Sequence, residues 1–182
     1  MRKIIVSSQV SLDAVVDSPQ HFVFDYANDE FMKYASDQLF ASDTLIMGRI
    51  TYEAFAEAWS ARAGADVFAD RMNSLPKYVA SRTLTEPLTW NSSLLKGDVV
   101  EAVKNLKQQP GQDILQYGSG ELTHTLLQAG LIDEYRLMVF PVTIGSGERI
   151  MEKVDKTTFK LLERKAFSTG VMVLHYQPTN KA

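Results

Sequence analysis

Cysteine is absent from the 182-residue chain. Its absence excludes disulfide bonds, thiolate catalysis and zinc–thiolate sites. Runs of basic residues are missing too, since 19 lysines and arginines stand against 22 aspartates and glutamates, a formal net charge of −3. A surface for nucleic acid or an anionic membrane needs a basic patch or stripe, so we expect neither as a partner.

Long hydrophobic segments are missing as well. The N-terminal run of residues 4–6 is broken at once by Ser7, Ser8 and Gln9, so no signal-peptide core forms. No stretch reaches the length of about 18 apolar residues that a membrane-spanning helix requires. We therefore expect a cytoplasmic protein without a membrane partner.

Several catalytic motifs cannot be found. The chain lacks the G-x-x-x-x-G-K-[ST] phosphate loop, the H-E-x-x-H metal motif and the G-x-S-x-G nucleophile turn. The histidines at positions 21, 124 and 175 lie far apart, without the spacing of metal ligands. These absences argue against a standard NTPase, and we expect no metal site.

What the chain does contain is an alternation of strand and helix patterns over its first 130 residues. Helix 31–40 has a candidate N-cap in Asn28 or Asp29, and Asp98 is the candidate cap of helix 99–106. The alternation predicts a mainly parallel sheet with helices on both faces. Strands are predicted at 3–10, 44–47, 78–80, 88–90 and 113–117, and helices at 31–40, 51–59, 65–75, 99–106 and 121–129.

The pattern changes after Asp133. Residues 135–142, 159–167 and 171–176 have the composition of strands, and no helix of normal length lies between them. With residues 168–170 as a hairpin turn, these strands are expected to be antiparallel. The length suffices for a full core, so we expect a single domain over residues 1–177 with a frayed tail at 178–182.

Three turns each follow a predicted parallel strand, at residues 48–49, 81–83 and 118–120. In open α/β sheets, ligands bind outside the carboxyl ends of the strands. Two of the turns are helix starts that contain glycine, where unpaired N–H groups and the helix dipole suit a phosphate. Two of them carry an arginine, Arg49 or Arg82, which binds phosphate bidentately. Together they favour a ligand with several phosphates, such as NADP.

Each turn also has a purely structural interpretation. Gly48-Arg49 alone fits an ordinary strand-to-helix turn with a surface arginine. Gly118-Ser119-Gly120 fits packing glycines equally well, because Thr123 stands where the G-x-G-x-x-G fingerprint has its last glycine. The acidic residue that a Rossmann domain carries about 20 residues later is missing as well, which disfavours that fold.

The ordered set of motifs resembles a known family. Residues 47–53, Met-Gly-Arg-Ile-Thr-Tyr-Glu, resemble the G-R-x-T-[WY]-E turn of dihydrofolate reductases. Residues 81–83 resemble the second cofactor loop of these enzymes, and residues 117–122 the third. The runs at 131–137 and 141–147 are more similar to the reductase domain of riboflavin-biosynthesis enzymes and its small bacterial relatives. The resemblance extends from Ile4 to about Tyr176.

This resemblance implies a three-layer αβα dihydrofolate-reductase-like fold that binds NADPH in an extended pose. It implies that Arg49 lies near the 2′-phosphate, that Ser81 and Arg82 surround the adenosine ribose phosphate, and that the third turn follows the pyrophosphate. Such relatives commonly form dimers through the sheet, so we expect a homodimer. The cofactor-binding residues that the resemblance implies are Gly48, Arg49, Thr51, Ser81, Arg82, Gly118, Ser119, Gly120 and Leu122.

Two departures from these families bear on the substrate. Ala14 stands where the riboflavin-type reductases usually read S-L-D-G, and the Pro-Trp loop of true dihydrofolate reductases is missing. We therefore expect an NADPH-dependent reductase of a small heterocycle, a ribosylamino-pyrimidine or a pterin-like compound, rather than of dihydrofolate itself. The alternative is a non-catalytic nucleotide-binding module on the same fold.

Asp13 is the candidate catalytic residue. It follows the first predicted strand, and we interpret it as a group that orients the substrate or relays a proton. The alternative is an aspartate that merely forms the turn after a strand, which its short, hydrogen-bonding side chain suits well.

Overall fold

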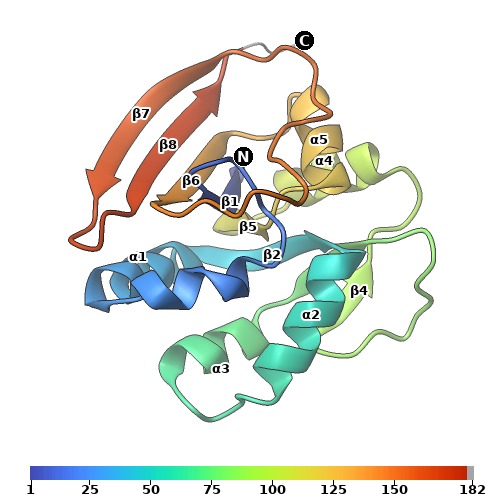
Figure 1. Ribbon diagram of the computed structural model, residues 1–182. Helices are drawn as coiled ribbons and strands as arrows, with labels where there is room; N and C mark the ends of the chain where they lie inside the picture. The colour runs from blue at the N-terminus through green and yellow to red at the C-terminus, as the bar shows by residue number, and fades with distance from the viewer. Residues whose placement is uncertain (180–182) are drawn as a thin grey trace. The chain divides into compact units, whose positions relative to one another are not determined.

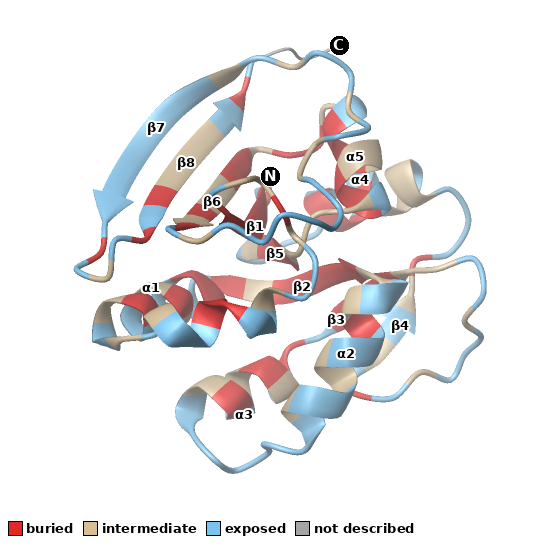
Figure 2. Ribbon diagram, viewed as in Figure 1, coloured by how far each residue is buried: buried red, intermediate tan, exposed pale blue. Residues whose placement is uncertain are grey.

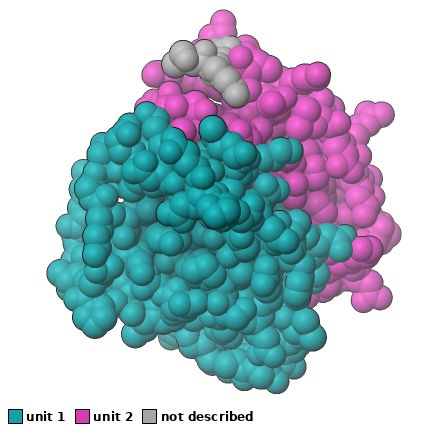
Figure 3. Space-filling model, turned by 180° about the vertical axis from the view of Figure 1, so that it is seen from behind, with its two compact units in different colours: residues 1–4, 36–117 teal, residues 5–35, 118–182 magenta. Residues whose placement is uncertain are grey.

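The computed structural model describes residues 1–179. They form two compact units that are interleaved along the chain, shown in two colours in Figure 3. The first unit comprises residues 1–4 and 36–117, and the second comprises residues 5–35 and the chain from Gly118 onward. Each unit combines strands with helices.

The first unit is built on parallel strands (Figure 1). Strand β2 pairs in parallel with β3 on one side and with β5 on the other, and β3 pairs in parallel with β4. In β2, Leu45, Ile46 and Met47 are completely buried, as expected of a strand covered on both faces. The bounds are β2 Ser42–Gly48, β3 Lys77–Ala80, β4 Ser92–Leu94 and β5 Asp113–Tyr117.

Three helices lie wholly in this unit: α2 (Arg49–Ser60), α3 (Val67–Ser74) and α4 (Val99–Gln108). Helix α2 packs on α3, β2 and β3. The predicted cap of α4 is confirmed, because the Asp98 carboxylate accepts the N–H of Glu101 at 3.0 Å. Asp66 caps α3 in the same way, through the N–H of Ala69 at 2.8 Å.

The predicted strand at residues 88–90 is wrong. Trp90 and Asn91 have φ angles of 58° and 49°, in the left-handed region, so the chain turns where the strand was expected. The indole N–H of Trp90 donates to Asn73 Oδ1 at 2.7 Å, which fixes the turn against α3. The strand in this part of the chain is β4, which begins only at Ser92.

The second unit contains β1 (Ile4–Ser11, except its first residue), β6 (Glu134–Phe140), β7 (Phe159–Ala166) and β8 (Met172–Pro178). Strands β1 and β6 are parallel, whereas β8 runs antiparallel to both β6 and β7. The predicted hairpin turn is confirmed, since Phe167 donates its N–H to the Val171 carbonyl at 2.9 Å and Gly170 has a φ of 88°. The mainly parallel α/β fold with antiparallel C-terminal strands is therefore confirmed.

An aromatic cluster forms a core of the second unit. Figure 2 colours the ribbon by burial and shows buried stretches in strands β1 and β6 of this unit. The Phe140 ring has edge-on contacts with Phe22, Tyr26 and Phe31, at centroid distances of 5.4, 5.8 and 6.3 Å. Phe31 belongs to α1 (Asp29–Phe40), and the Asn28 side chain caps this helix by accepting the Phe31 N–H at 3.0 Å. Two short 3₁₀ helices, η1 (Pro19–His21) and η2 (Val23–Tyr26), precede it, and α5 (Glu121–Gln128) completes the unit.

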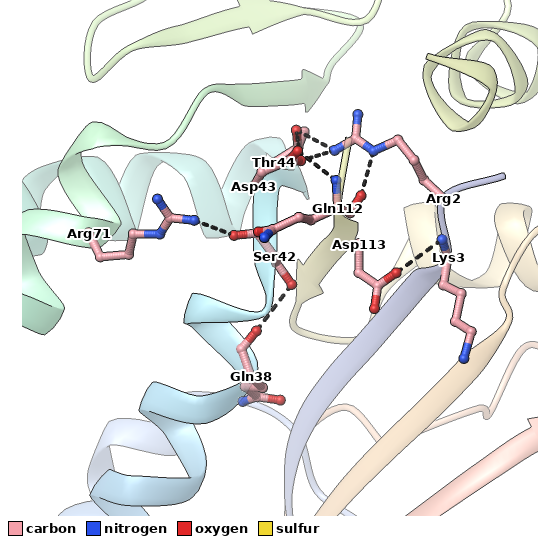
Figure 4. A network of polar contacts seen from close by, with 9 residues as sticks. All are labelled: Arg2, Lys3, Gln38, Ser42, Asp43, Thr44, Arg71, Gln112 and Asp113. Carbon is pink, nitrogen blue, oxygen red and sulfur yellow. Dashed lines mark hydrogen bonds and ion pairs between the residues drawn. The ribbon is translucent and has the colours of Figure 1, made fainter. Parts of the chain in front are cut away.

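A buried arginine anchors the start of the chain in the first unit (Figure 4). The Arg2 guanidinium donates to the Asp43 carboxylate, to Thr44 Oγ1 at 2.6 Å and to the Gln112 carbonyl at 2.6 Å. Asp43 in turn accepts the Gln112 N–H at 2.7 Å. Gly111, with a φ of 151°, is required here because a Cβ would come within 2.5 Å of the Asp43 carboxylate. These bonds fix the amino ends of β2 and β5.

The first residue of the predicted tail belongs to a strand. Strand β8 includes Pro178, and Thr179 donates its N–H to the Thr158 carbonyl at 2.9 Å, while residues 180–182 of the predicted tail lie outside the described residues. Among residues 1–179, no helix is both long and apolar enough to span a membrane. The single domain over 1–177 and the cytoplasmic location stay predictions.

Candidate cofactor site

The first two predicted turns leave the sheet at the same edge. In the β2–β3 pair Gly48 lies opposite Ala80, so the turns that begin at Arg49 and Ser81 follow neighbouring positions at the carboxyl ends of both strands. Strand β5, on the other side of β2, ends at Tyr117, directly before Gly118. The three strands before the predicted turns are therefore neighbours in one parallel sheet, as the ligand-binding edge of an α/β fold requires.

Helix α2 begins with an uncapped first turn. Its N-cap is Gly48, with extended backbone angles and no side-chain cap, and the first turn contains no acidic residue. A Cβ at Gly48 would meet nothing within 4 Å, so open space lies before the helix start. The N–H groups of this turn, which includes Thr51, and the positive dipole end are thus suited to an anion.

Among residues 1–179, the partner of the Arg49 guanidinium is Glu53, in an exposed ion pair. Its Nη1 lies 3.1 Å from Oε2 of Glu53, one turn along α2, and the two side chains are 44% and 48% exposed. Exposed pairs of this kind stabilise a protein by about 1 kcal/mol at most. An arriving phosphate can therefore replace Glu53 as the partner of Arg49 at little cost.

The second turn is shaped by a serine. Ser81 Oγ accepts the backbone N–H groups of Thr83 at 3.1 Å and of Leu84 at 3.0 Å. Ser81 therefore fixes the conformation of the loop in which Arg82 lies with an exposed side chain. Its own O–H hydrogen is not used in these two bonds, and the Thr83 hydroxyl lies 3.5 Å from Ser81 Oγ as one partner for it.

The third turn lies in the second unit. Gly118 has a φ of 83°, a conformation that favours glycine, and its N–H donates to the Ser7 carbonyl at 3.1 Å. Ser119 is half-buried, and its Oγ lies 2.7 Å from the hydroxyl of Tyr135. Gly120 is the N-cap of α5, without a side-chain cap, and a Cβ there would meet nothing within 4 Å. The turn combines an open helix start with a fixed backbone.

Two features of α5 limit what this turn can bind. Leu122 is buried, so its side chain belongs to the core and only its backbone can serve a ligand. Glu121 is an acidic residue in the first turn of the helix, where it competes with an anionic ligand for the dipole. The amides near Gly120 are therefore a less favourable anion site than those of α2.

Asp13 fixes a loop. Its carboxylate accepts hydrogen bonds from Ser11 Oγ at 2.6 Å and from the backbone N–H groups of Ile144 at 3.0 Å and Gly145 at 2.7 Å. These bonds, that of Ser11 foremost, lower the pKa of Asp13 to about 2. The group is therefore ionised near neutral pH and has no proton to give, and the bonds support the turn-forming interpretation. A role in orienting the substrate stays a prediction.

Ala14, which follows Asp13, stands where the S-L-D-G pattern has its glycine, and its backbone conformation is strained. Ala14 has a φ of 72°, the left-handed conformation that glycine adopts without strain. Its N–H donates to the Ser11 carbonyl at 3.0 Å, and its carbonyl accepts the Ile150 N–H at 2.9 Å. The loop after β1 thus keeps a glycine-like conformation without a glycine.

Two residues beneath the third turn, Ser8 and Tyr135, were not among the predicted site residues. Ser8 Oγ donates to the Gly118 carbonyl at 3.3 Å. The side chains of Ser8 and Tyr135 are both buried. Ser8 had a signal in the sequence, because a serine between the buried residues Val6 and Val10 of a strand needs a polar partner. Tyr135 had none beyond its place in a strand. Within the described chain, no group of three or more histidines and acidic residues could hold a metal ion.

Comparison with known proteins identifies the family. Residues 2–173 match the sequence profile of the RibD C-terminal domain. The chain belongs to the RibD C-terminal domain family. The uncharacterized Bacillus subtilis (strain 168) protein YyaP is 30% identical over 179 residues, which cover 96% of this chain and 94% of YyaP. YwjB, an uncharacterized protein of the same strain, is 27% identical over 179 residues, covering 96% and 97% of the two chains.

Solved structures confirm the predicted dihydrofolate-reductase-like fold. A Shewanella sp. PV-4 protein named for riboflavin biosynthesis superposes with a TM-score of 0.77 at 22% identity, covering 98% of this chain and 99% of the other. The Thermotoga maritima diaminohydroxyphosphoribosylaminopyrimidine deaminase/5-amino-6-(5-phosphoribosylamino)uracil reductase superposes with a TM-score of 0.69 at 13% identity. The match covers 97% of this chain but 56% of that protein. At these identities the likeness shows the fold alone.

Proposed function

We propose that this RibD C-terminal domain protein is an NADPH-dependent reductase that transfers hydride to a small heterocycle of the ribosylamino-pyrimidine or pterin type. The observation that carries the proposal is the pair of arginine-bearing turns, Gly48-Arg49 and Ser81-Arg82, at the carboxyl ends of two neighbouring parallel strands. The reductase activity in the name of the Thermotoga maritima protein supports a ribosylamino-pyrimidine as the substrate class.

The residues at the turns fit this cofactor. Arg49 would bind the 2′-phosphate, with Arg82 sharing the charge of the adenosine ribose phosphate, because a guanidinium binds phosphate oxygens in pairs. The uncapped first turn of α2 would take a phosphate, and the turn at 118–120 would follow the pyrophosphate. When bound, NADPH supplies the hydride, and the chain binds and orients it.

Titration with two nucleotides tests the cofactor. NADPH and NADH are added separately to the native protein, and nucleotide fluorescence and thermal unfolding are followed. We expect a saturable response to NADPH that is far stronger than that to NADH, and its loss in Arg49→Ala and Arg82→Ala. Glu53→Ala is the matched control, because it removes the partner of Arg49 and leaves the guanidinium in place. A native protein without any response to either nucleotide would overturn the proposal.

Steady-state oxidation of NADPH distinguishes a reductase from a binding module. The panel begins with 5-amino-6-ribosylaminouracil and its 5′-phosphate and continues through other aminopyrimidines and pterins. Turnover of a ribosylamino-pyrimidine supports the proposal. Tight NADPH binding with no oxidation across the panel favours the alternative, a non-catalytic nucleotide-binding module on the same fold.

We further propose that the protein is a homodimer. Seven of the eight residues of β7 are exposed, and Leu161 and Leu162 keep 45% and 48% of their surface accessible. Leu161 and Leu162 form an exposed apolar stretch between the charged residues Lys160 and Glu163, and we expect a second copy of the chain to cover this stretch. Light scattering after size exclusion tests this, with Leu161→Lys expected to shift the mass from dimer to monomer.

A further inference from the structure

The turn at 118–120 rests on a chain of three hydroxyl groups in the second unit. Tyr135 of β6 is completely buried, and its hydroxyl lies 2.7 Å from Ser119 Oγ and 3.3 Å from Ser8 Oγ. Ser8 Oγ donates in turn to the carbonyl of Gly118 at 3.3 Å. The phenol of Tyr135 is thus the central member of a chain that begins and ends in the turn.

The number of hydrogens limits how this chain can be arranged. Each hydroxyl has one hydrogen to donate, whereas its oxygen can accept. While Ser8 donates to Gly118, the contact between Ser8 and Tyr135 requires Tyr135 to donate, and Ser119 must then donate to Tyr135. In this arrangement the Ser119 hydrogen is taken up inside the protein, and only oxygen lone pairs remain for a ligand. That state disfavours an anion.

The reverse arrangement favours an anion. When Tyr135 turns its O–H toward Ser119, the shorter of its two contacts, the Ser119 oxygen is satisfied from within and its own hydrogen is free for a phosphate oxygen. Only rotation of hydroxyl hydrogens separates the two arrangements. Burial raises the pKa of Tyr135, so the phenol keeps the proton that it has to donate.

We propose that Tyr135 is a positioning residue for the nucleotide cofactor: it donates a hydrogen bond to Ser119 and so directs the Ser119 hydrogen to the cofactor pyrophosphate. This inference rests on the proposed function, because it requires a nucleotide at the third turn. Tyr135 is completely buried and acts only through Ser119. Ser8 is its competitor, since it accepts the same phenol proton in the other arrangement.

The surroundings of Tyr135 supply a clean substitution and a matched control. Its ring packs edge-on against Phe159, at 6.4 Å between centroids, and lines an apolar cavity of about 180 Å³. Tyr135→Phe keeps the ring and this packing and removes only the hydroxyl. Tyr176 lines the same cavity and lies opposite Tyr135 in the β6–β8 pair, so Tyr176→Phe makes the same chemical change nearby.

The experiment measures the dissociation constants of NADPH and NADH for four variants: Y135F, S119A, the Y135F/S119A double variant and Y176F. Thermal unfolding without nucleotide reports on the fold. We expect Y135F and S119A each to weaken both nucleotides by about three- to tenfold, the range of one neutral hydrogen bond. The double variant should bind no more weakly than S119A, and Y176F should bind like the native protein. Because both nucleotides contain a pyrophosphate, the preference for NADPH should stay unchanged in Y135F.

A fifth variant, Ser8→Ala, tests the direction of the proton. It removes Ser8 Oγ, the acceptor that competes for the Tyr135 proton, so NADPH should bind about two- to threefold more tightly. Damage to the fold would weaken binding instead. This test holds even where Y135F does not fold.

Several results would overturn the inference. They are native affinity in Y135F beside weakened S119A, losses that add in the double variant, a weakened Y176F, or unchanged or weaker binding in Ser8→Ala. If the native protein binds NADPH, these results overturn only the role of Tyr135. A native protein that binds neither nucleotide overturns the proposed function, and the role of Tyr135 with it.

Discussion

Carboxylates that accept backbone N–H groups fix the backbone in both units, as Asp43 and Asp98 do in the first, where cations add bonds to backbone carbonyls. In the first unit, cations donate to backbone carbonyls: the buried Arg2 to Gln112 at 2.6 Å, the half-buried Arg71 to Ser42 at 2.6 Å, and the buried Lys77 to Leu75 at 2.7 Å. In the second, carboxylates accept backbone N–H groups: Asp13 from Gly145 at 2.7 Å, Asp17 from Glu148 at 2.6 Å, and Glu30 from Ser168 at 2.7 Å.

The two kinds of contact, buried cations and surface carboxylates, respond differently to pH and to substitution. A buried cation retains its charge at a cost in desolvation, which lowers its pKa, as at Lys77. A carboxylate at the surface has its charged form stabilised by N–H groups, which lowers its pKa too, as at Asp13 and Glu30. The same direction of shift therefore marks a penalty at the buried cation Lys77 and a stabilisation at the carboxylates Asp13 and Glu30. Substitutions and pH changes can test each side of this contrast.

The largest effect is expected at Arg2. Arg2→Ala leaves Asp43 and the Gln112 carbonyl without their cation, and it should lower the free energy of unfolding by about 3 kcal/mol, as measured by urea denaturation. Lys3→Ala is the control, because Lys3 is exposed and its side chain should matter by no more than about 0.5 kcal/mol. A loss below 1 kcal/mol in Arg2→Ala would show that carbonyl-bound cations do not hold the first unit together.

Lys77 should make the first unit gain stability in alkali. Its side chain is 1% exposed, and burial lowers its pKa from 10.5 to about 8. Below pH 8 the lysine is charged in both states and the burial penalty is complete. Between pH 8 and 10.5 the unfolded chain binds more protons than the folded one, so stability rises with pH.

The measurement for Lys77 compares the native protein with Lys77→Met, which retains the length of the side chain without its charge. Relative to Lys77→Met, the unfolding free energy of the native protein should rise by on the order of 2 kcal/mol between pH 8 and 10. A difference that stays constant over this range would mean that burial does not lower the pKa of Lys77.

Ala14→Gly should stabilise the second unit. Ala14 has a φ of 72°, where an alanine is strained and a glycine is not. Glycine loses more chain entropy on folding than alanine does, so the net gain in the free energy of unfolding is about 0.5 to 1 kcal/mol. Thermal unfolding measures this gain. The matched change Ala54→Gly, at an exposed position inside α2, should cost about 1 kcal/mol. Destabilisation by Ala14→Gly would contradict this.

The elements of both units were predictable from the sequence because their signals are local. Periodic apolar residues and the caps Asn28 and Asp98 determine where helices begin, and Gly130, with a φ of 65°, lies just beyond the end of α5. Trp90 misled the prediction, because its side chain suits a strand while its bond to Asn73 holds the backbone in a turn.

The positions of the three candidate turns at strand ends were predictable, but the contacts of their residues were not. The turns after β2, β3 and β5 follow from strand order and glycine positions. The bond from Ser119 to Tyr135 and those from Asp13 to Ile144 and Gly145 join residues far apart in the chain, and two of them end on backbone atoms that no residue type marks. Such contacts depend on the register of the strands, which the sequence pattern does not specify on its own.

The pKa of Asp13 tests, at a single residue, whether backbone N–H groups stabilise a surface carboxylate. Its folded pKa of about 2 lies below the ordinary 3.8, so its hydrogen bonds to the loop at 144–145 are complete above about pH 3.8 and are lost as the pH falls through 2. The backbone N–H signal of Gly145 in an NMR titration should therefore shift with a midpoint near 2. In Asp13→Asn this titration should vanish, whereas Asp17→Asn, which removes the neighbouring anchor to Glu148, should leave it unchanged. A midpoint near 3.8 would mean that Ser11 and the loop amides do not stabilise this carboxylate, and the contrast between surface carboxylates and the buried Lys77 would then fail at its best-defined acidic residue.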